Sequence, residues 1–361
     1  MPRSRIYLDH AATTPVLPQA RAAVAEALER WANPSSPHAE GRAAKAALEG
    51  ARARIKAALG WTGDLIFTAT ASEAAALAFR RCHEVGPRPA LSTVEHDAVL
   101  TQVPEGEGFN LWVEKNGLVS PEALTTWLKL APGGLLAIQH ANSETGIVQR
   151  IAEISEVVDL AGSYLLVDCA QSAGKLPLPP ADLLIVSSSK VGGPPGVAAL
   201  LVRDLKLLVP SGGQEKGYRR GTENLPAILG WAAALEAQAW DFDRLNRLRA
   251  RLDVKLMAEG ANVLGLGVGR LPTIGAYAME HMSAMAQLVR FDALGFAVSA
   301  GSACSSGKVK TSHVLAALEV PTDVADKVIR VSFGPSTSEA EVDAFAAAWA
   351  SLAAEARSRA A

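Results

Sequence analysis

The chain has 361 residues, which at roughly 150 residues per domain predicts about two domains. Hydrophobic residues make up 49% and charged residues 20%, a globular balance that excludes an intrinsically disordered protein. Because 35 basic residues nearly balance 37 acidic ones, the net charge of -2 argues against a protein that coats nucleic acid or an anionic membrane.

Three cysteines, Cys82, Cys169 and Cys304, are too few and too dispersed for a disulfide framework or a Cys-x-x-Cys metal site. We therefore expect a reducing compartment and no bound metal. The N-terminus lacks the apolar stretch of a signal peptide, and no apolar run approaches the roughly 18 residues of a membrane-spanning helix. These features predict a soluble cytoplasmic protein with no nucleic-acid or membrane partner.

Seven short apolar runs predict buried strands, and helical stretches at 72–81 and 152–161 lie between some of them. The runs are 65–68, 90–93, 110–113, 135–138, 164–167, 183–186 and 197–202. Such alternation of strands and helices is typical of a doubly wound, mostly parallel α/β sheet. Only a Gly/Pro-rich turn separates the last two runs, which predicts one antiparallel pair.

A helical pattern follows from 228 to 257, and its regularly spaced leucines predict one long helix that joins two domains. The leucines are Leu245, Leu248, Leu252 and Leu256. Weaker strand signals at 275–278 and 328–333, and a final helix that opens on the capping box Ser338–Glu341, predict a smaller α+β domain. The predicted boundaries are 13–235 for the large domain and 1–12 with 236–361 for the small one.

Two reactive side chains follow predicted strands. Asp168 comes directly after the run 164–167, and Lys190 comes shortly after 183–186. Ligand sites of open α/β sheets lie at the carboxyl ends of strands. A partly desolvated lysine bonds covalently to a carbonyl carbon, and an ionised aspartate pairs with a pyridinium nitrogen. Together they suggest pyridoxal 5′-phosphate, although Asp168 alone fits a helix cap and Lys190 alone a surface charge.

Ordered segments along nearly the whole chain carry a family resemblance. They are 7–15, 33–38, 95–99, 144–149, 168–177, 212–215, 220–224, 299–307 and 329–332. Through them the chain resembles the cysteine desulfurases of the NifS/IscS type, class V aminotransferase-like enzymes of fold type I. The resemblance implies a pyridoxal-phosphate-dependent transferase with a large, seven-stranded, mostly parallel sheet domain and a smaller α+β domain.

The resemblance also implies roles around the cofactor. Lys190 would carry it covalently, Asp168 would pair with its ring nitrogen, Gln171 would lie near its phenolic oxygen and His96 would stack on its ring. The implied phosphate contacts are Ala71, Ser72, Ser187 and Thr222, the last reaching over from a second subunit. A homodimer follows from that last role.

The implied substrate is L-cysteine, with Arg330 binding its carboxylate and Asn33 and Asn142 contributing further contacts. Cys304 lies in a run of small polar residues that indicates a loop, and it matches the family's nucleophile. The resemblance therefore implies catalysis by Cys304, Lys190 and His96. The products would be L-alanine and a persulfide on Cys304, which passes sulfur to a protein acceptor such as an iron–sulfur scaffold.

Three positions depart from the family's pattern in the cofactor pocket. Ser189 stands where the family has a histidine, Ser143 where it has an asparagine, and Thr70 lies in a phosphate loop without the usual Ser-Gly pair. Loss of the histidine removes a hydrogen bond worth roughly 1.5–3 kcal/mol, which hydroxyls at 187–189 partly replace. We expect Ser189 and Ser143 still to line the cofactor site, with reduced cofactor affinity.

Alternative functions stay open. A related enzyme acting on selenocysteine or another amino acid fits the same cofactor residues, whereas a plain transaminase leaves Cys304 unexplained. A non-catalytic scaffold leaves the joint presence of these side chains unexplained. A hydrolase using Cys304 with His96 or His313 is possible by residue type, but it gives no role to Lys190 and Asp168.

Overall fold

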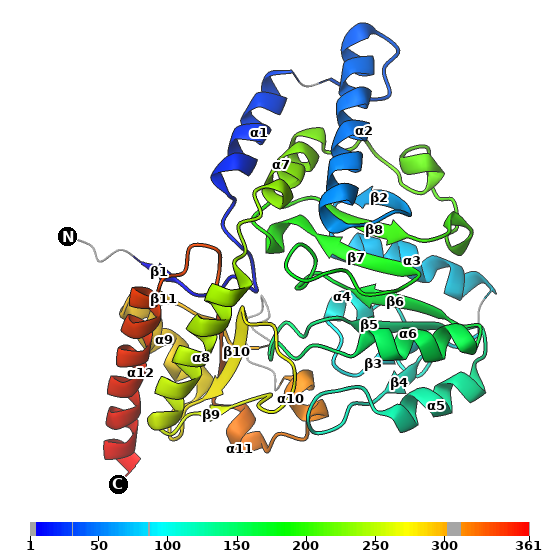
Figure 1. The fold of residues 1–361 in the computed structure, drawn as a ribbon. Helices are drawn as coiled ribbons and strands as arrows, with labels where there is room; N and C mark the ends of the chain where they lie inside the picture. Colours follow the sequence, from blue (N-terminus) through cyan, green and yellow to red (C-terminus); the bar gives the residue numbers. More distant parts are fainter. Residues whose placement is uncertain (1–4, 31, 86, 302–311, 361) are drawn as a thin grey trace.

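A computed structural model describes residues 5–30, 32–85, 87–301 and 312–360 (Figure 1). Its largest sheet has seven strands in the order β2-β8-β7-β6-β5-β3-β4. They are β2 (Asp64–Thr68), β3 (Ala90–Ser92), β4 (Phe109–Leu111), β5 (Leu135–Gln139), β6 (Tyr164–Asp168), β7 (Leu183–Ser187) and β8 (Ala198–Val202). β8 is antiparallel to β2 and β7, and the other pairs are parallel. The predicted doubly wound sheet, with its antiparallel β7–β8 pair, is confirmed.

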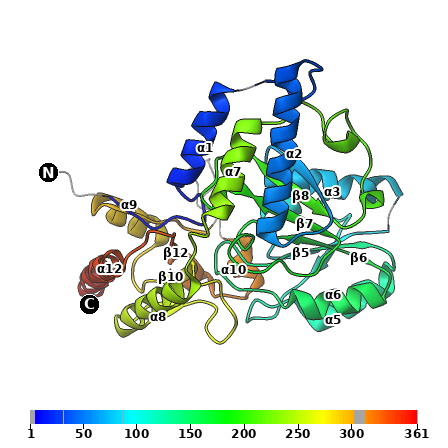
Figure 2. The ribbon, with the colours of Figure 1, turned by 45° about the horizontal axis from the view of Figure 1, so that its top comes forward.

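Helices cover both faces of this sheet because successive strand side chains point to opposite sides. In β5, Leu136 and Ile138 pack in one apolar cluster, whereas Leu135 and Ala137 pack in another. The first cluster includes α2 (Ala39–Leu59), α5 (Pro121–Leu130), α6 (Ile151–Leu160) and α7 (Leu225–Glu236), and the second includes α3 (Ala71–Val85) and α4 (Asp97–Leu100). α1 (Pro18–Glu29), α7 and α2 lie side by side (Figure 2).

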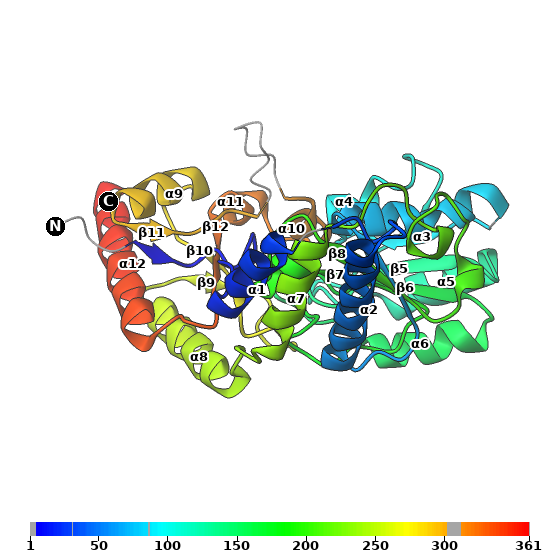
Figure 3. The ribbon, with the colours of Figure 1, turned by 90° about the horizontal axis from the view of Figure 1, so that it is seen from above.

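A second, three-stranded sheet lies at the other end of the molecule (Figure 3). Its strands are β9 (Asn262–Val263), β10 (Ile274–Ala278) and β12 (Val328–Ser332), and α8 (Phe242–Ala258), α9 (Ala284–Ala293) and α12 (Glu339–Ala360) pack with it. The N-terminal strand β1 (Ile6–Tyr7) pairs with β11 (Phe296–Ala297) beside this sheet. The short helices α10 (His313–Ala317) and α11 (Thr322–Ala325) lie between β11 and β12 in the chain. The exact domain boundaries stay predictions.

The single long helix predicted for 228–257 is wrong. α7 ends at residue 236 and α8 begins at 242, because Gln238 takes a left-handed φ of 44° and Asp241 caps α8 by accepting a hydrogen bond from the Arg244 amide at 2.9 Å. The leucine stripe of α8 is buried as predicted. The predicted capping box is also confirmed, since the amide of Ser338 donates to the Glu341 carboxylate at 2.8 Å and the Ser338 hydroxyl accepts from the Glu341 amide at 3.3 Å.

No helix in the described part of the chain is both long and apolar enough to cross a membrane. Within the same residues, no group of three or more His, Cys, Asp and Glu side chains is arranged to hold a metal ion.

Substitution of Trp349 would test how the helices pack on the smaller sheet. It is fully buried and stacks on Phe291, with ring centroids 6.0 Å apart. We expect Trp349→Ala to lower the free energy of unfolding by about 3–5 kcal/mol in urea titrations, because it leaves a large cavity. Leu160→Ala, at a side chain that is 89% exposed, should change it by less than about 0.5 kcal/mol. Equal effects of the two substitutions would contradict this view of the core.

Candidate active site

A cavity of about 590 Å³ lies at the carboxyl ends of β6 and β7 and reaches β12 of the second sheet. Most of the predicted site residues line it: Ala71, Ser72, His96, Ser143, Asp168, Gln171, Ser187, Ser189, Lys190 and Arg330. These residues come from widely separated parts of the sequence. The fold therefore brings together the side chains that were singled out by strand position and by family resemblance.

Asp168 and Lys190 lie on neighbouring segments of the cavity wall. Asp168 ends β6, and its Oδ1 accepts a hydrogen bond from the Ala170 amide at 2.8 Å. Lys190 ends the 3-10 turn η1 (Ser188–Lys190), and its Nζ donates to the carbonyl oxygen of Ala12. Burial raises the pKa of Asp168, while burial and the nearby Arg330 charge lower the pKa of Lys190. A lower pKa gives Lys190 a larger fraction of neutral, nucleophilic amine.

His96 and Gln171 line the same cavity. The Nδ1 atom of His96 accepts from the Ala98 amide at 3.1 Å and so caps α4, which leaves Nε2 as the nitrogen that carries the proton in the neutral ring. Gln171 donates through Nε2 to the carbonyl oxygen of Ala11 at 2.9 Å. Its Oε1 is buried and has no hydrogen-bond partner among the described residues. The wall thus contains an unsatisfied acceptor.

Arg330 is held in place from two sides on β12. Its Nη1 donates to the carbonyl oxygen of Ser143 at 3.0 Å, and its Nη2 pairs with the Asp9 carboxylate at 2.9 Å. Its Nε is buried without a partner in the described part of the chain. Ser143 accepts this hydrogen bond through its backbone carbonyl oxygen. The contact therefore does not depend on whether residue 143 is a serine or the asparagine of the family pattern.

The loop ahead of α3 is shaped by its own side chains. The Thr70 hydroxyl accepts from the Glu73 amide at 3.1 Å, and the Glu73 carboxylate accepts from the Ala69 amide at 2.6 Å. Ala71 and Ser72 stand in the first turn of the helix that comes next. Ser187 and Ser189 also line the cavity, and their hydroxyls lie 3.4 Å apart, whereas Ser188 is fully buried and outside the cavity lining.

Three predicted site residues within the described part of the chain, Asn33, Asn142 and Thr222, do not line the cavity. Asn142 shapes a turn, since its Oδ1 accepts from the amides of Glu144 at 2.9 Å and Thr145 at 2.8 Å. Asn33 and Thr222 are not buried and do not line the cavity of this single chain. Cys304 lies in the segment 302–311, outside the described residues.

Glu144 is a cavity residue to which the sequence analysis gave no role. It is buried, accepts a hydrogen bond from the Ser312 hydroxyl at 2.6 Å, and lies so close to Gly301 that a Cβ atom there would overlap its carboxylate. Burial raises the pKa of Glu144. It therefore contacts the two described residues that flank the segment 302–311. The sequence signal that could have identified Glu144 is its place in the family-matching segment 144–149. Asp9, which lies in the matching segment 7–15, was also given no role.

The chain is similar to a known protein family along almost its whole length. The family profile described as Aminotransferase class-V matches residues 6–345. The chain belongs to the class V aminotransferase family. It is 35% identical to the cysteine desulfurase of Cereibacter sphaeroides, over 94% of this chain and 93% of that protein. It is 33% identical to the cysteine desulfurase IscS of Dictyoglomus turgidum, over 94% and 92%.

Solved structures of this family agree with the fold. A NifS-like protein from Rickettsia africae superposes with a TM-score of 0.89 at 30% identity, covering 96% of this chain and 99% of that one. A structure described as SspA in complex with cysteine superposes with a TM-score of 0.77 at 29% identity, covering 92% and 100%. The predicted fold and the resemblance to cysteine desulfurases of the NifS/IscS type are confirmed. The predicted enzyme class, cysteine desulfurase, is confirmed by relatives that match nearly the full chain.

The contact between Gly301 and Glu144 can be tested by a double-mutant cycle. We expect Gly301→Ala to lower the free energy of unfolding by about 1–3 kcal/mol, because its methyl group has no space beside the carboxylate. In a Glu144→Ala background the same change should cost less than about 0.5 kcal/mol. Gly269→Ala, where an added Cβ meets nothing within 4 Å, is the matched control. An equal cost of Gly301→Ala in both backgrounds would show that Glu144 is not the obstacle.

Proposed function

We propose that this protein is a pyridoxal-phosphate-dependent cysteine desulfurase that converts L-cysteine to L-alanine and leaves a persulfide on Cys304. The observation that supports this most is the joint placement of Lys190, Asp168 and Arg330 around one cavity. An amine, a carboxylate and a guanidinium are the three groups that a cofactor aldehyde, a pyridine nitrogen and a substrate carboxylate require.

The cavity fits the cofactor by volume and by chemistry. About 590 Å³ lies within the usual range for small-molecule sites, roughly 300–1,000 Å³. The buried Oε1 of Gln171 has no partner in the described part of the chain, so the polar lining of the cavity is incomplete without a bound polar group. The first turn of α3, with Ala71 and Ser72, offers backbone amides to a phosphate, and Ser187 and Ser189 add hydroxyls. When bound, pyridoxal phosphate supplies an electron sink for the bonds at the substrate Cα.

Lys190 would hold the cofactor through Nζ and, once released, take the proton from the substrate Cα. Its lowered pKa favours both tasks, because each needs the neutral amine. Asp168 would hold the proton on the ring nitrogen. Burial raises its pKa, and a positive charge opposite the carboxylate acts against that shift and favours the ionised form.

Arg330 would bind the substrate carboxylate with the part of its guanidinium that remains free. Asp9 and the Ser143 carbonyl fix the plane of the group, so the substrate is oriented before reaction. The Cys304 thiolate then forms a bond to the substrate sulfur as the carbon–sulfur bond breaks, and the electron pair of that bond stays with the carbon side. His96, through Nε2, and Lys190 would move the protons that complete alanine.

We also propose roles for Thr222, for two asparagines and for a protein sulfur acceptor. Thr222 would reach the phosphate of a second subunit in a homodimer, which accords with its position away from the cavity of its own chain. Asn33 and Asn142 keep their proposed contribution to the substrate site, for Asn142 through the turn that carries Ser143. The persulfide sulfur would pass to a protein acceptor such as an iron–sulfur scaffold, in the cytoplasm.

The direct test is product formation from L-cysteine by protein reconstituted with pyridoxal phosphate, with a thiol reductant present. We expect equal amounts of alanine and sulfide. Cys304→Ala should keep the cofactor absorbance but lose at least about 100-fold in rate, and Lys190→Ala should lose as much together with the covalent linkage.

The matched control is Cys82→Ala, because Cys82 is remote from the cavity lining and burial raises the pKa of its thiol to about 11. That variant should react like the unmodified protein. A Cys304→Ala variant that releases alanine and sulfide at the normal rate would refute the role of Cys304. A protein that binds no pyridoxal phosphate would refute the proposed function.

A further inference from the structure

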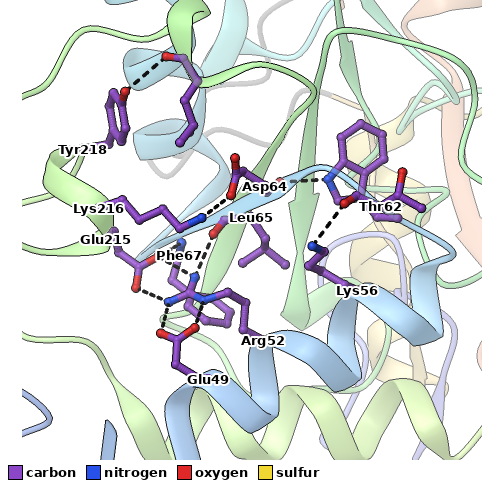
Figure 4. A network of polar contacts seen from close by, with 12 residues as sticks. Glu49, Arg52, Lys56, Thr62, Asp64, Leu65, Phe67, Glu215, Lys216 and Tyr218 are labelled. Carbon is purple, nitrogen blue, oxygen red and sulfur yellow. Dashed lines mark hydrogen bonds and ion pairs between the residues drawn. The ribbon is translucent and has the colours of Figure 1, made fainter. Parts of the chain in front are cut away.

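A buried ion pair lies at the open edge of the large sheet (Figure 4). β2 is an edge strand, so the backbone groups on its outer side have no neighbouring strand to pair with. Arg52 of α2 donates through Nη1 to the carbonyl oxygen of Leu65 at 2.7 Å. Glu215 accepts from the amide of Phe67 at 2.8 Å. These two side chains thus take the place of the missing strand.

The two side chains also bind each other with the geometry of a fork. Arg52 Nη1 and Nη2 donate to the two Glu215 carboxylate oxygens at 2.7 and 2.8 Å. Arg52 is only 8% exposed and Glu215 5%, and the guanidinium lies 4.6 Å from the centre of the Phe67 ring. Desolvation offsets much of the electrostatic attraction in a buried ion pair. The main effect of this pair is therefore to fix the positions of the two side chains, and its contribution to stability is small.

The backbone of Glu215 and of the residue after it is in an unusual conformation. Glu215 and Lys216 have left-handed φ angles of 49° and 59°, which non-glycine residues adopt only where their surroundings impose them. Lys216 forms a second ion pair to β2, with Asp64. The turn η3 (Glu215–Gly217) is therefore fixed to the edge of β2 by consecutive side chains.

Arg219, two residues after this turn, contacts the loop that lines the main cavity. Its Nε donates to the Glu73 carboxylate at 3.1 Å, and the other oxygen of Glu73 accepts from the Ala69 amide. Residues 69–72 line the main cavity, whereas Thr68, Glu73 and Arg219 line a second cavity of about 530 Å³. The segment 69–73, which runs into the first turn of α3, thus lies between the two cavities. Arg219 contacts it from the second cavity, whereas Lys190 lines the main cavity.

We propose that Arg52 and Glu215 are positioning residues for the phosphate-binding loop. They fix the turn at 215–217 on β2, the turn places Arg219, and Arg219 holds the loop 69–73 in the shape that lines the main cavity. The proposal rests on the cofactor site proposed above, because it assigns the cofactor phosphate to Ala71 and Ser72. Neither Arg52 nor Glu215 touches the cavity, so their effect on the cofactor is transmitted through Arg219 and Glu73.

The test combines two readouts on Glu215→Gln. The first is hydrogen–deuterium exchange of the amides of 68–74 in cofactor-free protein, and the second is the dissociation constant of pyridoxal phosphate from an absorbance titration. Loss of a hydrogen bond to a charged group predicts about tenfold faster exchange and about tenfold weaker binding. Arg219→Gln should give the same two changes without altering the edge of β2, which keeps the test valid if Glu215→Gln fails to fold.

Two controls on the same helix as Arg52 separate positioning from general loss of stability. Arg54→Met removes an exposed ion pair with Glu236, and Leu48→Ala removes a buried side chain that has no polar contact with the turn. Both should leave exchange at 68–74 and cofactor binding within about twofold of the unmodified protein. Unchanged values in Glu215→Gln and Arg219→Gln, or equal changes in Leu48→Ala, would overturn the inference. If the unmodified protein binds no pyridoxal phosphate, the proposed function fails, and the exchange data still decide the positioning role.

Discussion

Parallel pairing of β5, β6 and β7 is the constraint on which the site depends. The register aligns Gln139 with Asp168 and Asp168 with Ile185, so the ends of all three strands meet at one edge of the sheet. The end of β6 then supplies Asp168, and the end of β7 with the turn after it supplies Ser187 and Lys190, to one cavity. The fully apolar strand interiors hold this register, because each strand is buried on both faces by helices.

The second sheet adds the guanidinium of Arg330 to the site. Arg330 reaches the cavity from β12, and its orientation depends on Asp9 near the N-terminus and on the Ser143 carbonyl. Three separate parts of the chain therefore fix one guanidinium. Burial and this same charge lower the pKa of Lys190, so under the proposed function substrate binding at Arg330 and amine reactivity at Lys190 would be electrostatically linked.

Much of the fold and of the site could be predicted from the sequence, and the failures have physical reasons. The strands of the large sheet were found because apolar runs bounded by turns are a strong local signal. The break between α7 and α8 was missed because the helical pattern continues across Gln238, where only the backbone changes. Asp9 and Glu144 lie in family-matching segments, but they were missed as site residues because their contacts, with Arg330 and with Gly301 and Ser312, are long-range.

Lys175, which is buried, and Lys190, which is partly buried, are both candidates for the cofactor lysine, and the structure distinguishes them. Burial lowers the pKa of Lys175 to about 7, but its Nζ lies 4.5 Å from the centre of the Trp240 ring and it does not line the cavity. Lys190 lines the cavity beside Asp168. The most direct test is borohydride reduction of the protein with pyridoxal phosphate, followed by peptide mass spectrometry. We predict a phosphopyridoxyl group on Lys190, whereas a group on Lys175 or on surface lysines alone would contradict the proposed role of Lys190.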